Sequence, residues 1–111
     1  MQDLNVVRNT SKSYTLTIED SGSPVDISDY TIYFTVKKNS NQADAQALIS
    51  KTVTIHTEPL QGKTIISLTP TDTDIAPGTY LYNINYLTGV GVIQQATVPK
   101  QFTVIPNLKG V

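Results

Sequence analysis

The sequence predicts an all-β protein, folded as an antiparallel β-sandwich of seven to eight strands. Three observations support this prediction. Apolar and polar residues alternate over many short segments, clusters of Gly, Pro, Asn and Asp separate those segments, and no stretch has the roughly 3.6-residue period of an amphipathic helix. Short alternating segments between turn residues are typical of sandwiches. A small β-barrel is the competing architecture.

The length of the chain is suited to one domain. A chain of 111 residues buries about two-thirds of the surface that its unfolded form exposes, so a single sandwich core is feasible. We expect residues 1–105 to form the sandwich and residues 106–111 to form a C-terminal tail. The sequence contains no Cys, so neither a disulfide nor a thiolate-bound metal stabilises the fold.

Four strands are expected in the first half of the chain. They cover residues 4–8, 14–19, 30–38 and 49–57. Each shows the two-residue period of a half-buried strand, and the pattern is strongest over residues 30–38. Lys51 shares the parity of the apolar residues in the fourth strand, which predicts a bulge or a sheet edge at that point.

Four further strands are expected in the second half. They cover residues 63–69, 79–87, 92–98 and 100–105. Pro99 separates the last two. Because proline has no N–H to donate to a ladder, this position is suited to an edge or a bulge and not to a central strand.

The turn between the fifth and sixth strands has a distinctive composition. Pro70 ends one strand, and four Thr and Asp residues follow it. Pro77-Gly78 then turns the chain into the next strand, in which Tyr80 is the second residue. This order is the tyrosine-corner pattern of immunoglobulin-like sandwiches. We expect the Tyr80 ring to enter the core and its hydroxyl to bind backbone near residues 72–74. An ordinary Tyr at the core edge is the alternative.

No catalytic, metal-binding or cofactor-binding constellation is recognisable in the sequence. His56 is predicted to be a surface residue on the polar face of its strand, because a triad or a metal site needs partner residues that the sequence does not supply. Asp72 and Asp74 are candidates for calcium ligands, but the acid density is too low for the six to eight oxygens that calcium takes. We therefore expect a non-enzymatic protein without a metal or a cofactor.

The charge and hydropathy of the chain argue against two kinds of partner. The net charge is −1 and 15% of the residues are charged, whereas nucleic-acid binding needs a basic face. No apolar run approaches the roughly 18 residues of a membrane span, and the residues after Met1 lack the basic and apolar character of a signal segment. We expect neither nucleic-acid binding nor a membrane association.

Two large apolar residues lie opposite the core parity. Tyr33 and Leu81 belong to strands that are neighbours in the immunoglobulin-like order, so they are candidates for an outward patch that docks on another protein. Val90 and Ile93 are candidates for an extension of that patch. Scattered exposed apolar residues, which are normal on protein surfaces, are the alternative.

Several motifs resemble those of a known group of proteins. They are Val7–Thr10, Tyr14–Ile18, Asp20–Ile32, Leu68–Ile84 and Phe102–Val104. On these motifs the chain resembles the immunoglobulin-like N-terminal domain of phage baseplate upper proteins and related small tail and head proteins of tailed phages. That family often has Arg-Gly-Asp near its start, where this chain reads Arg8-Asn9-Thr10.

The resemblance implies a non-enzymatic structural protein of a tailed-phage virion. Such a protein would be an adaptor or decoration module bound to tail, baseplate or capsid, in several symmetry-related copies. Its partners would be other virion structural proteins, and it would be made in the host cytoplasm and located in the virion. In the family this domain usually begins a longer protein. The alternative function is a carbohydrate-binding or adhesion β-sandwich module, which would present exposed aromatic side chains.

Overall fold

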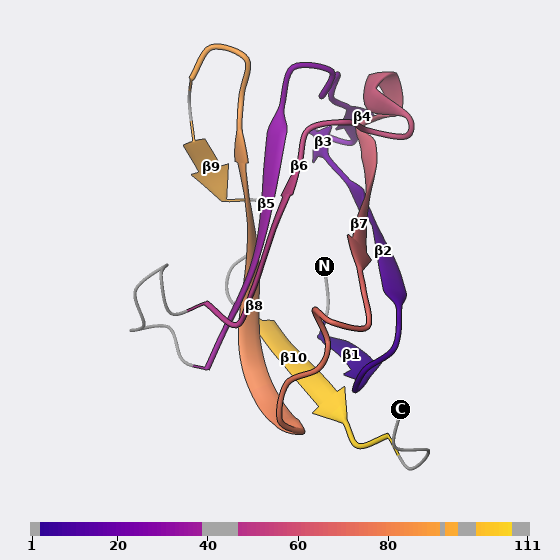
Figure 1. Ribbon diagram of the computed structural model, residues 1–111. Coiled ribbons are helices and arrows are strands. Elements are labelled where there is room, and N and C mark those ends of the chain that lie inside the picture. The colour runs from indigo at the N-terminus through magenta and orange to yellow at the C-terminus, as the bar shows by residue number, and fades with distance from the viewer. Residues whose placement is uncertain (1–2, 39–46, 92, 96–99, 108–111) are drawn as a thin grey trace.

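The computed structural model describes residues 3–38, 47–91, 93–95 and 100–107, and this part of the chain forms two packed layers of β-strands (Figure 1). The larger sheet has the strand order β1-β10-β8-β5-β6, and β9 also pairs with β8. Its strands are β1 (Leu4–Val7), β10 (Lys100–Ile105), β8 (Gly78–Leu87), β5 (Thr31–Lys37), β6 (Ile49–Val53) and β9 (Ile93–Gln95).

The smaller layer covers one face of that sheet. It consists of the antiparallel pair β2 (Lys12–Thr17) and β7 (Lys63–Leu68), followed at one end by the hairpin β3 (Glu19–Asp20) and β4 (Ser23–Pro24). One 3₁₀ turn, η2 (Pro59–Gln61), precedes β7. No helix in the described ranges is long and apolar enough to cross a membrane.

The predicted fold class is confirmed, because this arrangement is an all-β, immunoglobulin-like sandwich. Seven of the described strands have four residues or more. One pair departs from the expected antiparallel pattern, since β1 lies parallel to β10, with Leu4 opposite Phe102 and Val7 opposite Ile105. The N-terminal strand thereby covers the edge of the larger sheet beside the last strand.

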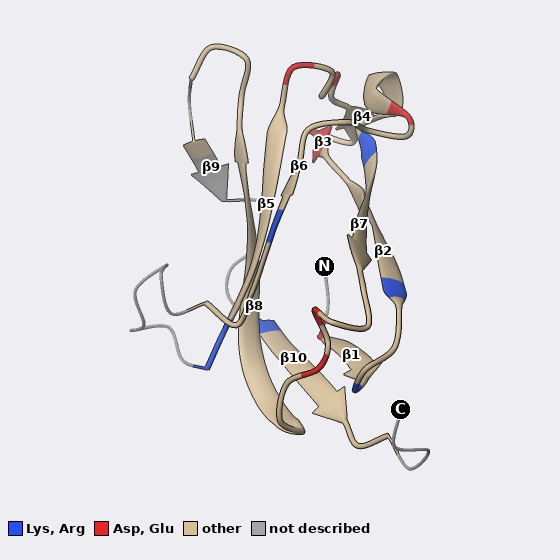
Figure 2. Cartoon of the chain, in the orientation of Figure 1, with Lys and Arg blue, Asp and Glu red and all other residues tan. Residues whose placement is uncertain are grey.

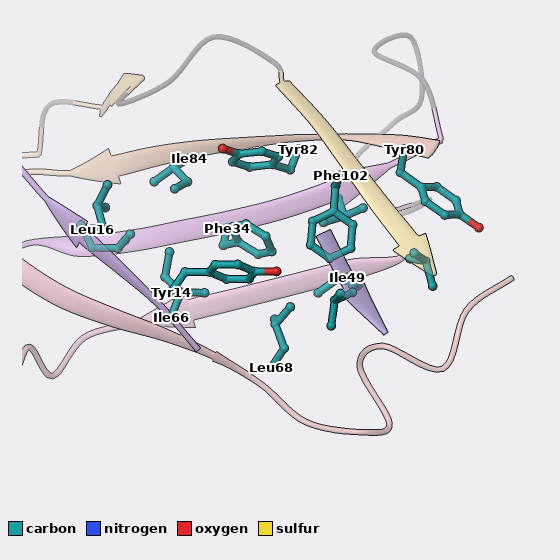
Figure 3. Close-up of a cluster of buried hydrophobic side chains, with 14 of the residues drawn as sticks. Tyr14, Leu16, Phe34, Ile49, Ile66, Leu68, Tyr80, Tyr82, Ile84 and Phe102 are labelled. Carbon is teal, nitrogen blue, oxygen red and sulfur yellow. The ribbon is translucent and has the colours of Figure 1, made fainter. Parts of the chain in front are cut away.

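Apolar side chains of alternate residues fill the space between the layers. Figure 3 shows Tyr14 and Leu16 of β2, with Ile66 and Leu68 of β7, facing side chains of the larger sheet. Phe34 lies at the centre of an aromatic group, with its ring centroid 5.5 Å from Tyr82 and 6.1 Å from Phe102. These two contacts have the tilted and edge-on geometries that aromatic rings favour. The two-residue period had predicted each of these residues as inward-facing.

Most predicted strand bounds agree with the observed ones to within two residues, but two strands differ by more. β6 ends at Val53 and not at residue 57, because the chain then turns so that His56 enters the interior. Of the strand expected over residues 92–98, the structure shows β9 at Ile93–Gln95, while residues 96–99, which include Pro99, lie outside the described residues. The prediction of an edge at Lys51 is confirmed, since β6 is the last strand of its sheet.

The tyrosine corner is present, but its acceptor is not the predicted one. Tyr80 is buried in the core, and its hydroxyl donates to the carbonyl oxygen of Ala76 at 2.5 Å. The backbone near residues 72–74 is engaged elsewhere. The Thr73 carbonyl accepts from the N–H of Ile75 at 2.9 Å and from that of Asn9 at 3.4 Å. The corner is therefore hydrogen-bonded both to Tyr80 of β8 and to Asn9 in the turn after β1.

Candidate functional site

The outer face of the larger sheet is the main candidate surface. The smaller layer packs against one face only (Figure 1), so alternate side chains of β5, β6 and β8 point away from the core and are exposed or half-buried. Strand β8, at the centre of this sheet, carries no charged residue over its whole length (Figure 2). The side chains gathered there are mostly amides and hydroxyls.

A hollow of about 320 Å³ lies in this face. Its floor is a row of three short polar residues on adjacent strands, since Thr35 of β5 pairs with Ser50 of β6 and with Asn83 of β8. The neighbouring outward positions lie two residues away, about 7 Å along each strand. Longer side chains at these positions, such as Tyr33 and Lys37, surround the row. The described residues that line the hollow are Tyr33, Thr35, Lys37, Ser50, Asn83, Asn85 and Ile93.

The lining of the hollow can form hydrogen bonds that the protein itself leaves unused. Among the described residues, the side chains of Thr35, Ser50, Asn83 and Asn85 have no hydrogen-bond partner. Hydroxyls and carboxamides both donate and accept. Among the described residues of the lining, Lys37 is the charged one and none carries a carboxylate. The surface is therefore suited to a polar ligand of low charge.

The two residues predicted as a protein interface flank this hollow. Tyr33 and Leu81 face outward from neighbouring strands, as the sequence predicted, and both are half-buried. Tyr33 pairs with Asn85, however, whereas Leu81 pairs with Lys37, so they are four positions apart in register, about 13 Å along the strand. They do not form one continuous apolar patch, and their role as an interface remains a prediction.

Ile93 belongs to the same lining as Tyr33, and strand β8 lies between the strands of these two residues. It is 69% exposed, lies on β9 opposite Leu87, and contributes to the same lining. The extension of the outward patch by Ile93 stays a prediction, because β8 separates its strand from that of Tyr33. The sequence did not single out the polar residues of the floor, because a Thr, a Ser and an Asn at outward positions are ordinary surface residues until the register places them in one row.

A second hollow lies at one end of the sandwich and has a structural explanation. It also measures about 320 Å³ and is lined by residues of the turn before β5 and of the turn after β8. Asp26 in this lining accepts hydrogen bonds from the backbone N–H of Ser28 at 3.0 Å and from its hydroxyl at 2.5 Å. These two bonds lower the pKa of Asp26 from its ordinary value. The carboxylate therefore closes a local turn.

His56 is not a surface residue, so that prediction is wrong. Its side chain is half-buried, with Nδ1 2.9 Å from the Thr64 hydroxyl and Nε2 2.7 Å from the carbonyl oxygen of Tyr30. Since a carbonyl only accepts, Nε2 carries a proton, and in the neutral ring Nδ1 accepts from Thr64. The imidazole thus links β7 to the start of β5 and has no ring nitrogen left for a substrate or a metal.

The two acids considered for calcium are engaged in ion pairs. Asp72 Oδ2 lies 3.0 Å from Lys51 Nζ and 2.8 Å from the N–H of Thr69, and Asp74 Oδ1 lies 3.0 Å from Arg8 Nε. Across the described part of the chain, no group of three or more His, Cys, Asp or Glu residues could hold a metal ion.

Comparisons with known proteins bear on the fold. No protein-family model matches the chain, and no curated protein matches its sequence. Among solved structures, the crystal structure of CopC from Methylosinus trichosporium OB3b is similar, with a TM-score of 0.52 and 16% sequence identity. The match covers 96% of this chain and 87% of that chain. A likeness at this identity supports the all-β sandwich fold and carries no functional assignment.

Proposed function

We propose that this protein is a non-enzymatic structural protein of a tailed-phage virion, an adaptor or decoration module bound to tail, baseplate or capsid. The observation that carries the proposal is the outer face of the larger sheet, five strands wide along its main path, which no other layer of the described chain covers. The motifs that resemble the phage baseplate upper protein family support it as well. Its partners are other virion structural proteins, and it is made in the host cytoplasm before incorporation.

The proposed docking contact uses the apolar side chains of that face. Leu81 lies on the central strand β8, and Val7 and Ile105, which are 38% and 42% exposed, form a cross-strand pair at the β1 edge. Isolated apolar residues of this kind become the anchors of an interface when a partner excludes water from them. A symmetric particle repeats the contact in several copies, so a weak single contact is sufficient for stable incorporation.

A pair of adjacent residues provides a matched test. Leu81 and Gln101 are direct partners in register between β8 and β10. We expect Leu81→Arg to reduce the amount of protein in purified virions at least tenfold, because the charge is desolvated in the contact. Gln101→Arg, which adds the same charge at an exposed position of the neighbouring strand β10, is expected to have a smaller effect.

The measurement is quantitative mass spectrometry of purified particles, with thermal melts of both variants to confirm that they fold. Absence of the wild-type polypeptide from the particle would contradict the virion assignment. Normal incorporation of folded Leu81→Arg would contradict this docking face while leaving the virion assignment in place. A cryo-electron-microscopy map of the particle would then locate the contact.

A further inference from the structure

The hollow on the outer face of the larger sheet has the chemistry of a ligand site, and we infer that it binds a saccharide chain. This inference goes beyond the structural role, because it concerns the residues that line the hollow, whereas the proposed docking contact uses Leu81, Val7 and Ile105, which do not line it. The volume of about 320 Å³ lies at the lower end of the usual range for ligand pockets, which is roughly 300 to 1,000 Å³. It suits one or two sugar rings.

Charge excludes several other ligand classes. Nucleic acids and phosphorylated ligands are held by clusters of Lys and Arg, whereas the described part of the lining contains one cation, Lys37. Cationic ligands need a carboxylate or an aromatic cage, whereas the described lining residues include no carboxylate and one aromatic ring, that of Tyr33. The ligand is therefore neutral or nearly so.

Backbone pairing excludes an added peptide strand. Strand addition needs an open sheet edge with unpaired N–H and C=O groups. β5 has β6 on one side and β8 on the other, and β8 in turn pairs with β9 and β10 along its far edge. The floor of the hollow thus belongs to interior strands, and recognition there is made by side chains alone.

The remaining lining groups match the two surfaces of a sugar. The hydroxyls of Thr35 and Ser50 and the amides of Asn83 and Asn85 supply donors and acceptors without a partner among the described residues. These are the complements of sugar hydroxyls. The apolar C–H face of a sugar ring is suited to the aromatic ring of Tyr33 and to the aliphatic side chain of Ile93, which both line the hollow. A purely apolar ligand would leave the polar floor unpaired, which carries a cost.

The test is titration of the ¹⁵N-labelled protein with a panel of disaccharides, followed by NMR. The panel contains maltose, cellobiose, lactose and N,N′-diacetylchitobiose, each up to about 10 mM, which is ten times the Kd of a weak site at 1 mM. We expect at least one of them to shift the side-chain amide signals of Asn83 and Asn85 and the backbone signal of Thr35. No shifts with any member of the panel, or shifts confined to other surfaces, would overturn the inference.

Variants distinguish specific binding from weak general association. Asn83→Ala removes one carboxamide from the floor, and we expect it to weaken binding about tenfold, the effect of one lost hydrogen bond of roughly 1.4 kcal/mol. Gln101→Ala removes a carboxamide from the same face outside the hollow, and we expect unchanged affinity. Equal affinity of a folded Asn83→Ala protein and the wild type would overturn the inference. Its failure leaves incorporation into virions untouched, because that is measured on particles.

Discussion

The hydroxyl of Tyr80 connects the corner before β8 to the core, and Tyr80→Phe removes that single bond. The ring is 8% exposed, so its packing is retained, and only the 2.5 Å hydrogen bond to the Ala76 carbonyl is lost. A buried acceptor left without a partner would cost about 1 to 3 kcal/mol. Ala76, however, is an exposed residue, so water can replace part of the lost bond. We therefore expect a loss of about 1 kcal/mol in the free energy of unfolding.

Urea unfolding followed by circular dichroism measures this loss, and a thermal melt should show a midpoint lower by about 3 to 6 °C for a domain of this size. Tyr33→Phe is the matched control. It removes a hydroxyl from the outer face, where the hydroxyl of Tyr33 has no hydrogen-bond partner among the described residues. We expect its stability to stay within about 0.5 kcal/mol of the wild type. If the two variants unfold at the same urea concentration, the hydroxyl of Tyr80 does not stabilise the corner and the reasoning is refuted.

Substitutions at three further positions test other features of the described chain. Burial alone would raise the pKa of Asp72, but hydrogen bonds from Thr69 and Lys51 outweigh it, and the pKa lies below the ordinary value. Above about pH 4 the wild type should therefore be more stable than Asp72→Asn, and it should lose this advantage on acidification. An advantage that grows in acid would contradict the direction of the pKa shift. Burial, with a smaller contribution from a neighbouring tyrosine, raises the pKa of Tyr14 to about 12. In denaturant titrations, the free energy of unfolding of the wild type should therefore fall by up to about 3 kcal/mol between pH 10 and 12, and that of Tyr14→Phe should not. Asn9 has φ of 61°, in the left-handed region that glycine adopts readily and alanine does not. In urea unfolding, Asn9→Gly should therefore be nearly neutral, and Asn9→Ala should lower the free energy of unfolding by about 1 kcal/mol. Equal losses in the two variants would contradict a conformational cause.

The inward and outward faces of the strands were predictable from the sequence, because the two-residue period is a local property of the chain. The side chains of Phe34, Tyr82 and Phe102 enter the core as the alternation indicated. Register is not local. Tyr33 and Leu81 were correctly assigned to the outer face, but their separation depends on which residue of β8 lies opposite which residue of β5. For the same reason no sequence pattern revealed the polar floor of the hollow.

His56 illustrates the second limit of sequence reasoning. Its partners, Tyr30 and Thr64, are 26 and 8 residues away along the chain. A lone His after an alternating strand therefore has the same local pattern whether it is buried or exposed. The available signal was Thr64, a polar residue at an inward position of β7, where it is fully buried. A buried hydroxyl needs a partner, and His56 supplies it.

The unequal layers of the sandwich leave two open sides, and a polar contact crosses each of them. On one side the Tyr14 hydroxyl of β2 donates to the Asn5 carbonyl of β1 at 2.9 Å. On the other, Lys51 of the edge strand β6 points inward to Asp72 after β7. A charged residue that points inward from an edge strand disfavours the addition of another strand there, because its charge would have to be buried without this partner. Since β6 is protected in this way, while the outer face carries unpaired polar groups and Leu81, contacts with other molecules are expected through the face of the larger sheet and not through its β6 edge.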